Sequence, residues 1–158
     1  MKNKVRILIL ENIRSVENTA SIFRTASRFG VSNIILVGTS PAPLDRFGRK
    51  RRDFAKVSLG AEDEVSWEHI KPPALEKRLE DLGQAGFSIL ALEQTPRAQN
   101  IKDFQAPNKF ALVVGNEVTG VSEELLSLAD AVLEIPMPGQ KRSLNVSVAA
   151  GVALFVLK

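Results

Sequence analysis

Three turns in the last third of the sequence combine residue types that can form a ligand site. The turn 115–120 follows an apolar run, the turn 135–139 contains two prolines and a glycine, and the segment 143–147 contains two serines and an asparagine. In α/β proteins such turns lie at the carboxyl ends of parallel strands, where backbone amides and a few side chains face a ligand. We therefore expect a binding site in this part of the chain.

Composition excludes several kinds of chemistry. The chain has 158 residues, no cysteine and one histidine. Disulfides, thiolate nucleophiles and thiolate metal sites are therefore impossible, and a lone His69, expected to be exposed, forms neither a metal site nor a catalytic triad. The glycine-rich fingerprints of nucleotide phosphate loops and dinucleotide folds are also missing. We expect no metal, no nucleotide hydrolysis and no dinucleotide redox chemistry.

Positive charge is concentrated in one segment. Asp45–Lys56 contains six of the 21 lysines and arginines but only two of the 18 acidic residues, whereas the whole chain has a net charge of +3. A basic cluster on a nearly neutral body is typical of proteins that bind a polyanion, because neutralised phosphates release their counterions. A solvated loop that keeps the protein soluble accounts for the same run equally well.

Apolar runs and amphipathic segments alternate along the chain. The expected strands are Arg6–Leu10, Asn33–Val37, Glu64–Trp67, Phe87–Leu92, Phe110–Val114 and Ala131–Ile135. The expected helices are Ser15–Phe29, Arg49–Leu59, Pro73–Ala85, Ser122–Ala129 and Ser143–Leu157. Strands separated by helices predict an α/β fold, with a parallel sheet and helices on both faces. The length and the 44% hydrophobic content fit a single domain over residues 1–158.

The last expected helix, Ser143–Leu157, is apolar nearly all round. Such a helix must be covered on every side, and it is shorter than the roughly 20 residues that span a bilayer. We expect a homodimer to cover it; a central position inside one subunit is the alternative. The N-terminal apolar run Val5–Leu10 is too short for a signal peptide or a membrane span, which predicts a cytoplasmic protein with no membrane partner.

Three motifs carry a resemblance to a known family. Asn18–Ala26 with Phe29-Gly30, Gly115–Glu117 with Gly120, and Ile135–Met137 leading to Ser143–Ser147 occur in this order along the chain. In order and spacing they resemble the three motifs of the SpoU (TrmH-like) RNA 2′-O-ribose methyltransferases of the SPOUT superfamily, and the resemblance covers almost the entire chain. It implies a SPOUT fold whose C-terminal segment forms a deep trefoil knot, which pattern reasoning would never suggest because knots are so rare.

The resemblance also implies a cofactor and a set of site residues. S-adenosylmethionine would bind in the knot, and a homodimer would form around it. By position, the residues that look like cofactor contacts are Leu92, Gly115, Ile135, Met137, Ser143 and Leu144. Arg24 would be the central catalytic residue, and the residues shaping its surroundings would be Asn18, Glu117, Ser143 and Asn145. With the cofactor in one chain, Arg24 of the partner could complete the site.

Several roles within this set stay open. A guanidinium is a poor base near neutral pH, so we expect Arg24 to bind a phosphate or stabilise an oxyanion, with the base unassigned. Glu117 could accept from a ribose hydroxyl or orient Asn18. Ser143 and Asn145 could instead cap the last helix, which is compatible with substrate contact.

The expected substrate is RNA, with tRNA favoured over ribosomal RNA. No separate RNA-binding domain is expected, so the candidate RNA contacts lie on the catalytic domain: Arg14, Arg28, Arg46, Arg49, Lys50, Arg51, Arg52, Lys141 and Arg142. Two alternatives keep the same fold. One is a SPOUT methyltransferase that acts on a base nitrogen, and the other is a non-catalytic RNA-binding dimer.

Overall fold

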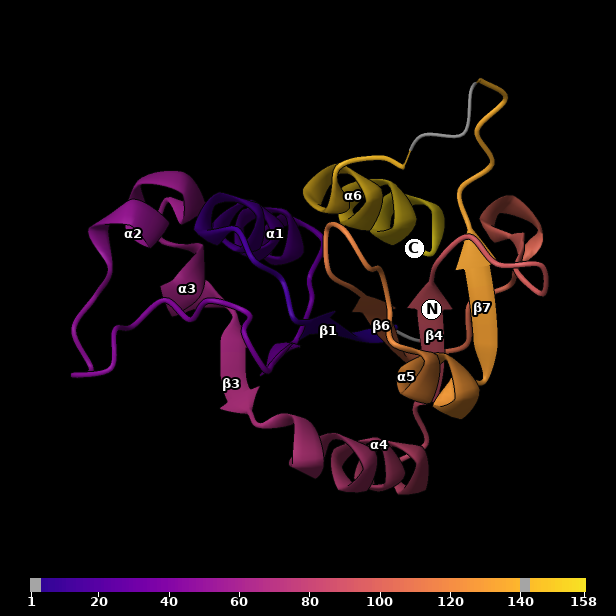
Figure 1. The fold of residues 1–158 in the computed structure, drawn as a ribbon, viewed down its shortest axis with the longest axis horizontal. Helices are drawn as coiled ribbons and strands as arrows, with labels where there is room; N and C mark the ends of the chain where they lie inside the picture. The colour runs from indigo at the N-terminus through magenta and orange to yellow at the C-terminus, as the bar shows by residue number, and fades with distance from the viewer. Residues whose placement is uncertain (1–3, 140–142) are drawn as a thin grey trace.

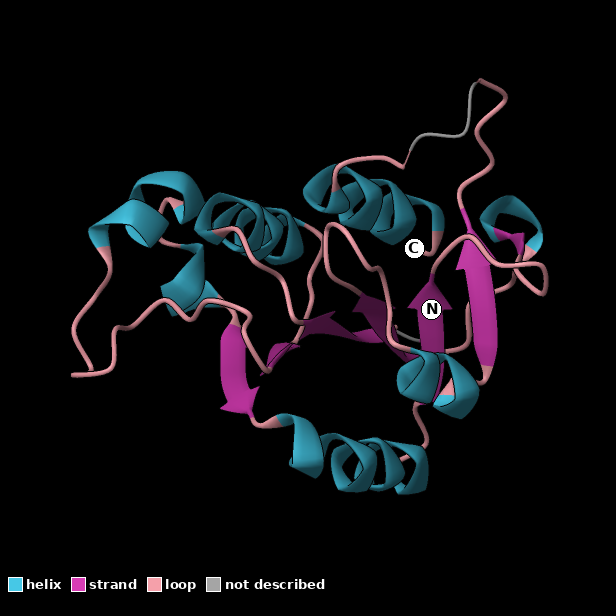
Figure 2. Ribbon diagram, in the orientation of Figure 1, coloured by secondary structure: helices cyan, strands magenta, loops and turns pink. Residues whose placement is uncertain are grey.

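A parallel β-sheet forms the centre of the computed structural model, which describes residues 4–139 and 143–158 (Figure 1, Figure 2). Its seven strands lie in the order β3-β2-β1-β6-β4-β7-β5, and all adjacent pairs are parallel. The strands are β1 (Val5–Glu11), β2 (Asn33–Val37), β3 (Ser66–Ile70), β4 (Ser88–Leu92), β5 (Gln99–Asn100), β6 (Lys109–Val114) and β7 (Ala131–Glu134). The predicted α/β class is confirmed.

Strand β1 lies between β2 and β6 and shows why these apolar runs become strands. Successive side chains of a strand point to opposite faces of the sheet. Leu8 and Leu10 belong to one core, and Ile7 and Ile9 belong to the other. Because a strand covered on both faces must be apolar at every position, the continuous run in the sequence corresponds to an interior strand.

Helices cover both faces of the sheet, as predicted (Figure 1). The α-helices are α1 (Val16–Arg28), α2 (Arg52–Ser58), α3 (Ala61–Glu64), α4 (Leu75–Gln84), α5 (Glu123–Leu128) and α6 (Val146–Val156), and two short 3₁₀ helices are η1 (Pro72–Ala74) and η2 (Ile101–Asp103). On one face α1, α2 and α6 share a core through Phe23, Phe54 and Leu154. On the other face α4 and α5 pack through Leu79 and Leu125.

Helix α1 is delimited by local signals at both ends. The Ser15 hydroxyl accepts a hydrogen bond from the backbone N of Asn18 at 3.1 Å, which caps the first turn. Gly30 has a φ of 69°, the left-handed conformation that commonly terminates helices. These signals place Asn18 in the first turn of α1 and leave Arg24 on its exposed side.

Two predicted boundaries on the basic side of the molecule were wrong. Helix α2 begins at Arg52 rather than Arg49, because residues 44–50 form a turn closed by an antiparallel bridge. The edge strand β3 occupies Ser66–Ile70 rather than Glu64–Trp67, since Glu64 still belongs to α3. The short elements α3 and β5 were not predicted because four and two residues are too few for a periodic pattern.

Helix α6 begins at Val146 rather than Ser143, and its two sides have different surroundings. Its buried residues are Ala150, Ala153 and Leu154. A row of apolar side chains, hereafter the α6 stripe, is exposed: Leu144 by 39%, Val148 by 51%, Val152 by 36% and Phe155 by 55%. The helix is therefore neither central nor fully covered within one chain. No helix among residues 4–139 and 143–158 is long and apolar enough to cross a membrane.

Candidate active site

A cavity of about 420 Å³ lies at the carboxyl ends of β4, β6 and β7, which are neighbours in the sheet. Its walls come from the strand ends Leu92, Val114 and Glu134, from the loop 115–120, and from residues before and within α6. Open parallel sheets place ligands beyond the carboxyl ends of their strands. The predicted position of the binding site agrees with this cavity.

The loop 115–120 folds tightly because Gly115 has no side chain. The backbone N of Asn116 donates to the carbonyl of Gly120 at 3.1 Å, and the backbone N of Gly120 donates to the carbonyl of Asn116 at 2.9 Å. A Cβ atom on Gly115 would lie 2.3 Å from the carbonyl carbon of Gly120. Since Gly115 is also buried, any larger residue there must displace the loop.

Two carboxylates hold the exit of this loop, and neither was predicted to be a site residue. Oε2 of Glu93 accepts from the backbone N of Val121 at 2.9 Å. The buried Glu11 accepts from the backbone N of Ser122 at 2.8 Å and from its hydroxyl at 2.6 Å. Both glutamates stand at the end of an apolar strand, β1 or β4. An acidic residue at that position is the signal that could have found them.

Glu117 joins the loop to the start of α1. Its carboxylate accepts from the backbone N of Arg14 at 2.8 Å, from the backbone N of Ser15 at 2.9 Å and from Nδ2 of Asn18 at 3.1 Å. Burial raises the pKa of Glu117, but the N–H donors, led by that of Arg14, outweigh it, and the pKa lies below its ordinary value. Glu117 is thus a weak proton acceptor, and the contact with Asn18 favours the orienting role.

Asn18 also contacts the start of α6. Nδ2 of Asn145 donates to Oδ1 of Asn18 at 3.1 Å. Oδ1 of Asn145 accepts from the backbone N and the hydroxyl of Ser147, at 2.9 and 2.6 Å, and so caps α6. The capping interpretation is therefore confirmed for Asn145 and wrong for Ser143, which precedes the cap and is exposed. All three sequence motifs meet in one chain of hydrogen bonds.

The six residues predicted to bind the cofactor come together. All of them line the cavity: Leu92, Gly115, Ile135, Met137, Ser143 and Leu144. The four apolar members can enclose a flat aromatic group, and the turn backbone supplies polar groups, which is the usual composition of a small-molecule site. Glu93, Glu117 and Glu134 line the same cavity and make it acidic. The role of these residues in cofactor binding stays a prediction.

Arg24 lies apart from this group within one chain. It is exposed on α1 and is not among the residues that line the cavity. Its neighbour in the motif, Asn18, is in contact with both Glu117 and Asn145. The structure therefore leaves Arg24 outside the site. It brings together the other four predicted catalytic residues: Asn18, Glu117, Ser143 and Asn145.

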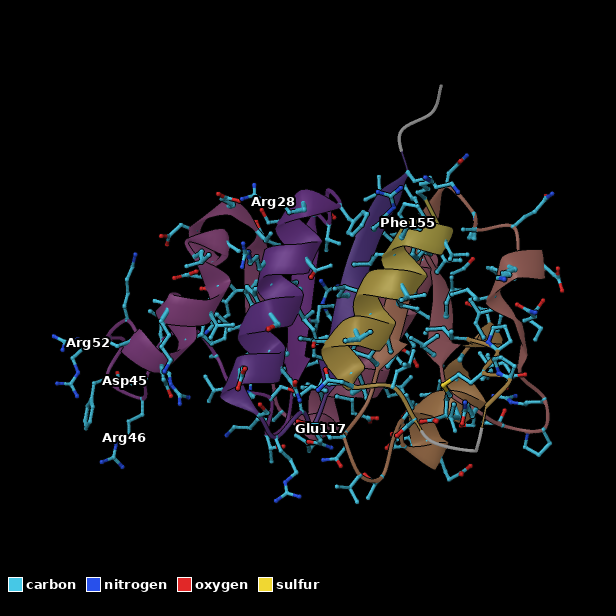
Figure 3. All side chains as sticks on the ribbon, turned by 90° about the horizontal axis from the view of Figure 1, so that it is seen from above. Arg28, Asp45, Arg46, Arg52, Glu117 and Phe155 are labelled. Carbon is cyan, nitrogen blue, oxygen red and sulfur yellow. The ribbon has the colours of Figure 1, made fainter. Side chains whose placement is uncertain are left out.

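The predicted RNA contacts of the basic segment differ in whether an acidic side chain pairs with them. Arg49 pairs with Asp45, Lys50 with Asp63 and Arg51 with Asp53, at N–O distances of 3.0, 3.1 and 2.9 Å. Arg46 and Arg52 are exposed and form no ion pair with any residue that the structure describes. Figure 3 shows both side chains pointing outward at the same end of the molecule. Local acids thus neutralise part of the charge that the sequence shows.

The remaining predicted RNA contacts are scattered. Arg14 is exposed beside Glu117, to which its backbone N donates. Arg28 lies in the last turn of α1, at the opposite end of the helix from Glu117 (Figure 3). Lys141 and Arg142 lie outside the described residues. The members of this set that the structure describes therefore do not form one patch.

The fold and the cavity define a class: an α/β protein with a small-molecule site beyond the carboxyl edge of a parallel sheet. Within the described ranges, no cluster of three histidine or acidic side chains could hold a metal ion.

The model of the SpoU rRNA Methylase family matches residues 5–155, which is nearly the whole chain. The protein belongs to this family, so the resemblance inferred from the motifs is confirmed.

Individual relatives agree with this assignment. A tRNA (guanosine(18)-2′-O)-methyltransferase of Aquifex aeolicus is 30% identical over 98% of this chain and 69% of its own length. A Thermus thermophilus enzyme of the same name is 33% identical over 94% of this chain and 71% of its own length.

Solved structures share the fold as well. The A. aeolicus TrmH/SpoU tRNA modifying enzyme has a TM-score of 0.82 at 30% identity, covering 99% of this chain and 75% of its own. A structure determined for 2-OH methylation of C/U34 on tRNA has a TM-score of 0.79 at 25% identity, covering 98% and 94%.

Proposed function

We propose that this protein transfers a methyl group from S-adenosylmethionine to a ribose 2′-hydroxyl of RNA, with tRNA as the substrate. The observation that carries the proposal is that two distant motifs line one cavity, through residues such as Gly115, Ile135 and Leu144, and that the third motif is hydrogen-bonded to both of them. Asn145 lines this cavity and donates a hydrogen bond to Asn18 of the first motif. A tRNA substrate is supported by the names of the Aquifex and Thermus relatives.

The residues of the cavity fit this cofactor. A volume of about 420 Å³ is within the range of small-molecule sites, and apolar side chains such as Leu92 and Met137 suit an adenine. Three glutamates in the wall, Glu93, Glu117 and Glu134, favour a ligand with positive charge. When bound, S-adenosylmethionine supplies a methyl group on a positively charged sulfur.

The residues of the chain have two tasks in this reaction. They must hold the ribose oxygen in line with the methyl carbon and the sulfur, and they must stabilise the oxygen as it loses its proton. The guanidinium of Arg24 suits a phosphate or the developing oxyanion. Glu117 holds Asn18 and the start of α1 in place, and its lowered pKa makes it a poor base.

The proposal includes a homodimer. The α6 stripe is an exposed apolar row on a helix whose other side is already buried, and a second copy would remove it from water. Arg24 lies outside the cavity of its own chain, so we propose that the partner's Arg24 completes each site. We also propose the trefoil knot of the SPOUT fold, which membership in the family supports.

The test is transfer of labelled methyl groups to total tRNA and, separately, to ribosomal RNA. We expect 2′-O-methylated nucleosides in the digest of the tRNA. Products methylated on a base nitrogen would contradict the proposed position, and labelling of ribosomal RNA alone would contradict the proposed substrate. Binding of S-adenosylmethionine is measured by calorimetric titration. If no cofactor binds, the protein is the alternative, a non-catalytic RNA-binding dimer. A cytoplasmic location is part of the same proposal.

A further inference from the structure

An aromatic ring stands at the tip of the basic segment. Phe47 is 66% exposed. The guanidinium carbons of Arg46 and Arg49 lie 4.8 and 5.0 Å from the centroid of its ring. A single exposed apolar residue is ordinary, but this ring is combined with two cations that contact it. Flat rings and guanidinium groups are the side chains on which unpaired nucleobases stack.

The turn that presents this ring is rigidly built. Oδ1 of Asp45 accepts from the backbone N of Phe47 at 2.8 Å and from that of Arg49 at 2.9 Å. The backbone N of Asp45 donates to the carbonyl of Arg49 at 2.8 Å, and Gly48 supplies the left-handed residue with a φ of 76°. We call Asp45–Arg49 the Phe47 turn. Its ring is displayed by the backbone and needs little ordering when a partner binds.

We propose that the Phe47 turn is a stacking platform for an unpaired nucleobase of the RNA substrate. The inference rests on the proposed function, because it assigns a contact to that same substrate. Stacking of a base on an aromatic ring strengthens binding about five- to 150-fold. An exposed cation–π contact contributes only about two- to fivefold. A base can therefore displace one guanidinium from the ring, and the released arginine can contact a neighbouring phosphate.

The charge around the turn fits the phosphates beside such a base. Arg46, Arg52 and Lys56 are exposed and form no ion pair with the residues of 4–139 and 143–158. Figure 3 shows Arg46 and Arg52 at the same outer end of the molecule, on either side of Asp45. An acidic protein segment would match the cations but not the ring. An aromatic ring flanked by cations matches single-stranded RNA, in which bases alternate with phosphates.

The test compares two fluorescent probes in anisotropy titrations of the full chain. One is an oligoadenylate strand of about 12 nucleotides, and the other is the same strand paired with oligouridylate. Phe47→Leu should weaken binding of the single strand at least about fivefold and leave duplex binding unchanged. The Phe47→Trp variant should still bind the single strand. Arg46→Ala should weaken both probes alike and reduce the salt dependence. Leu128→Ala, at an exposed position on α5, is the matched control.

A second readout reports stacking directly. The chain has one tryptophan, the half-buried Trp67, so wild-type protein is the background control. In the Phe47→Trp variant, the single strand should quench the additional fluorescence. Absence of quenching, equal binding of the single strand by wild type and Phe47→Leu, or equally Phe47-dependent binding of oligoglutamate would each overturn the inference. Methyl transfer to tRNA is measured separately, so transfer that persists in Phe47→Leu without loss of binding removes this inference and keeps the proposed function.

Discussion

Asn18 and Glu117 are 99 positions apart in the chain, and Nδ2 of Asn18 donates to Oε2 of Glu117 at 3.1 Å. The other end of the Asn18 amide accepts from Asn145, 127 positions later. One side chain thus fixes the start of α1 against both the loop 115–120 and the N-terminus of α6. A substitution at any of the three residues should therefore perturb the other two.

This coupling can be measured with a double-mutant cycle. Asn18→Asp places a second carboxylate against Glu117 and should lower the free energy of unfolding by about 1–3 kcal/mol. Glu117→Gln in that background provides an amide donor for the new carboxylate. The double variant should then lose about 1 kcal/mol less than the sum of the single losses, measured by urea unfolding. Additive losses would show that the two side chains are not coupled.

Acid should remove the contribution of Glu117 to stability. Its folded-state pKa is below the unfolded value of about 4.3, so the contribution is fully present above that value and is lost as the pH falls through the folded pKa. Glu117→Gln should cost about 1–2 kcal/mol at neutral pH, and this cost should decline as the pH falls below the unfolded value of about 4.3, measured by urea unfolding. The matched control is Glu80→Gln on the exposed side of α4, which should change stability by less than about 0.5 kcal/mol.

Gly115 and Gly83 should respond to alanine in opposite directions. In Gly115→Ala the new Cβ meets the backbone of Gly120, which should cost about 1–3 kcal/mol and weaken binding of S-adenosylmethionine. In Gly83→Ala the Cβ meets open space within α4, which should stabilise the protein by about 0.5–1 kcal/mol. Urea unfolding and calorimetry measure the two effects. Wild-type stability and cofactor binding in Gly115→Ala would contradict the tight loop.

A charge on the α6 stripe should separate the proposed dimer. Val148 is 51% exposed, so Val148→Glu should leave each chain folded while placing a carboxylate in the interface. Sedimentation velocity should show a dimer for wild type and a monomer for the variant. Leu128→Glu on α5 is the control and should stay dimeric. A monomeric wild type would contradict the proposed assembly.

Mixed dimers can show whether the sites are shared. Arg24→Ala removes the guanidinium, and Thr119→Trp fills the cavity from an exposed position. Each variant should be inactive alone. After mixing, half of the dimers are heterodimers with one intact site, so roughly a quarter of wild-type methyl transfer should return. No recovery in demonstrated heterodimers would place Arg24 and the cavity of the same chain together.

The accuracy of the sequence predictions followed the length and pattern of each element. Interior strands such as β1 and β6 were found almost to the residue, because burial on both faces requires a continuous apolar run. Helix α1 was found to within one residue at each end. Strand β5 was missed, since two residues carry no periodicity. The start of α2 was misplaced because Asp45 folds the preceding residues into a turn through contacts of its own side chain.

The amino-acid sequence by itself determined the α/β class, the family and six of the residues that line the cavity, because periodicity and motif spacing are properties of a linear chain. Only the tertiary structure showed that Glu11 and Glu93 hold the loop, that Asn18 bridges two motifs, and that Arg24 stands outside the cavity. Such contacts depend on the order of strands in the sheet and on how helices pack across it. Hydrogen bonds between residues about a hundred positions apart have no local signal in the sequence.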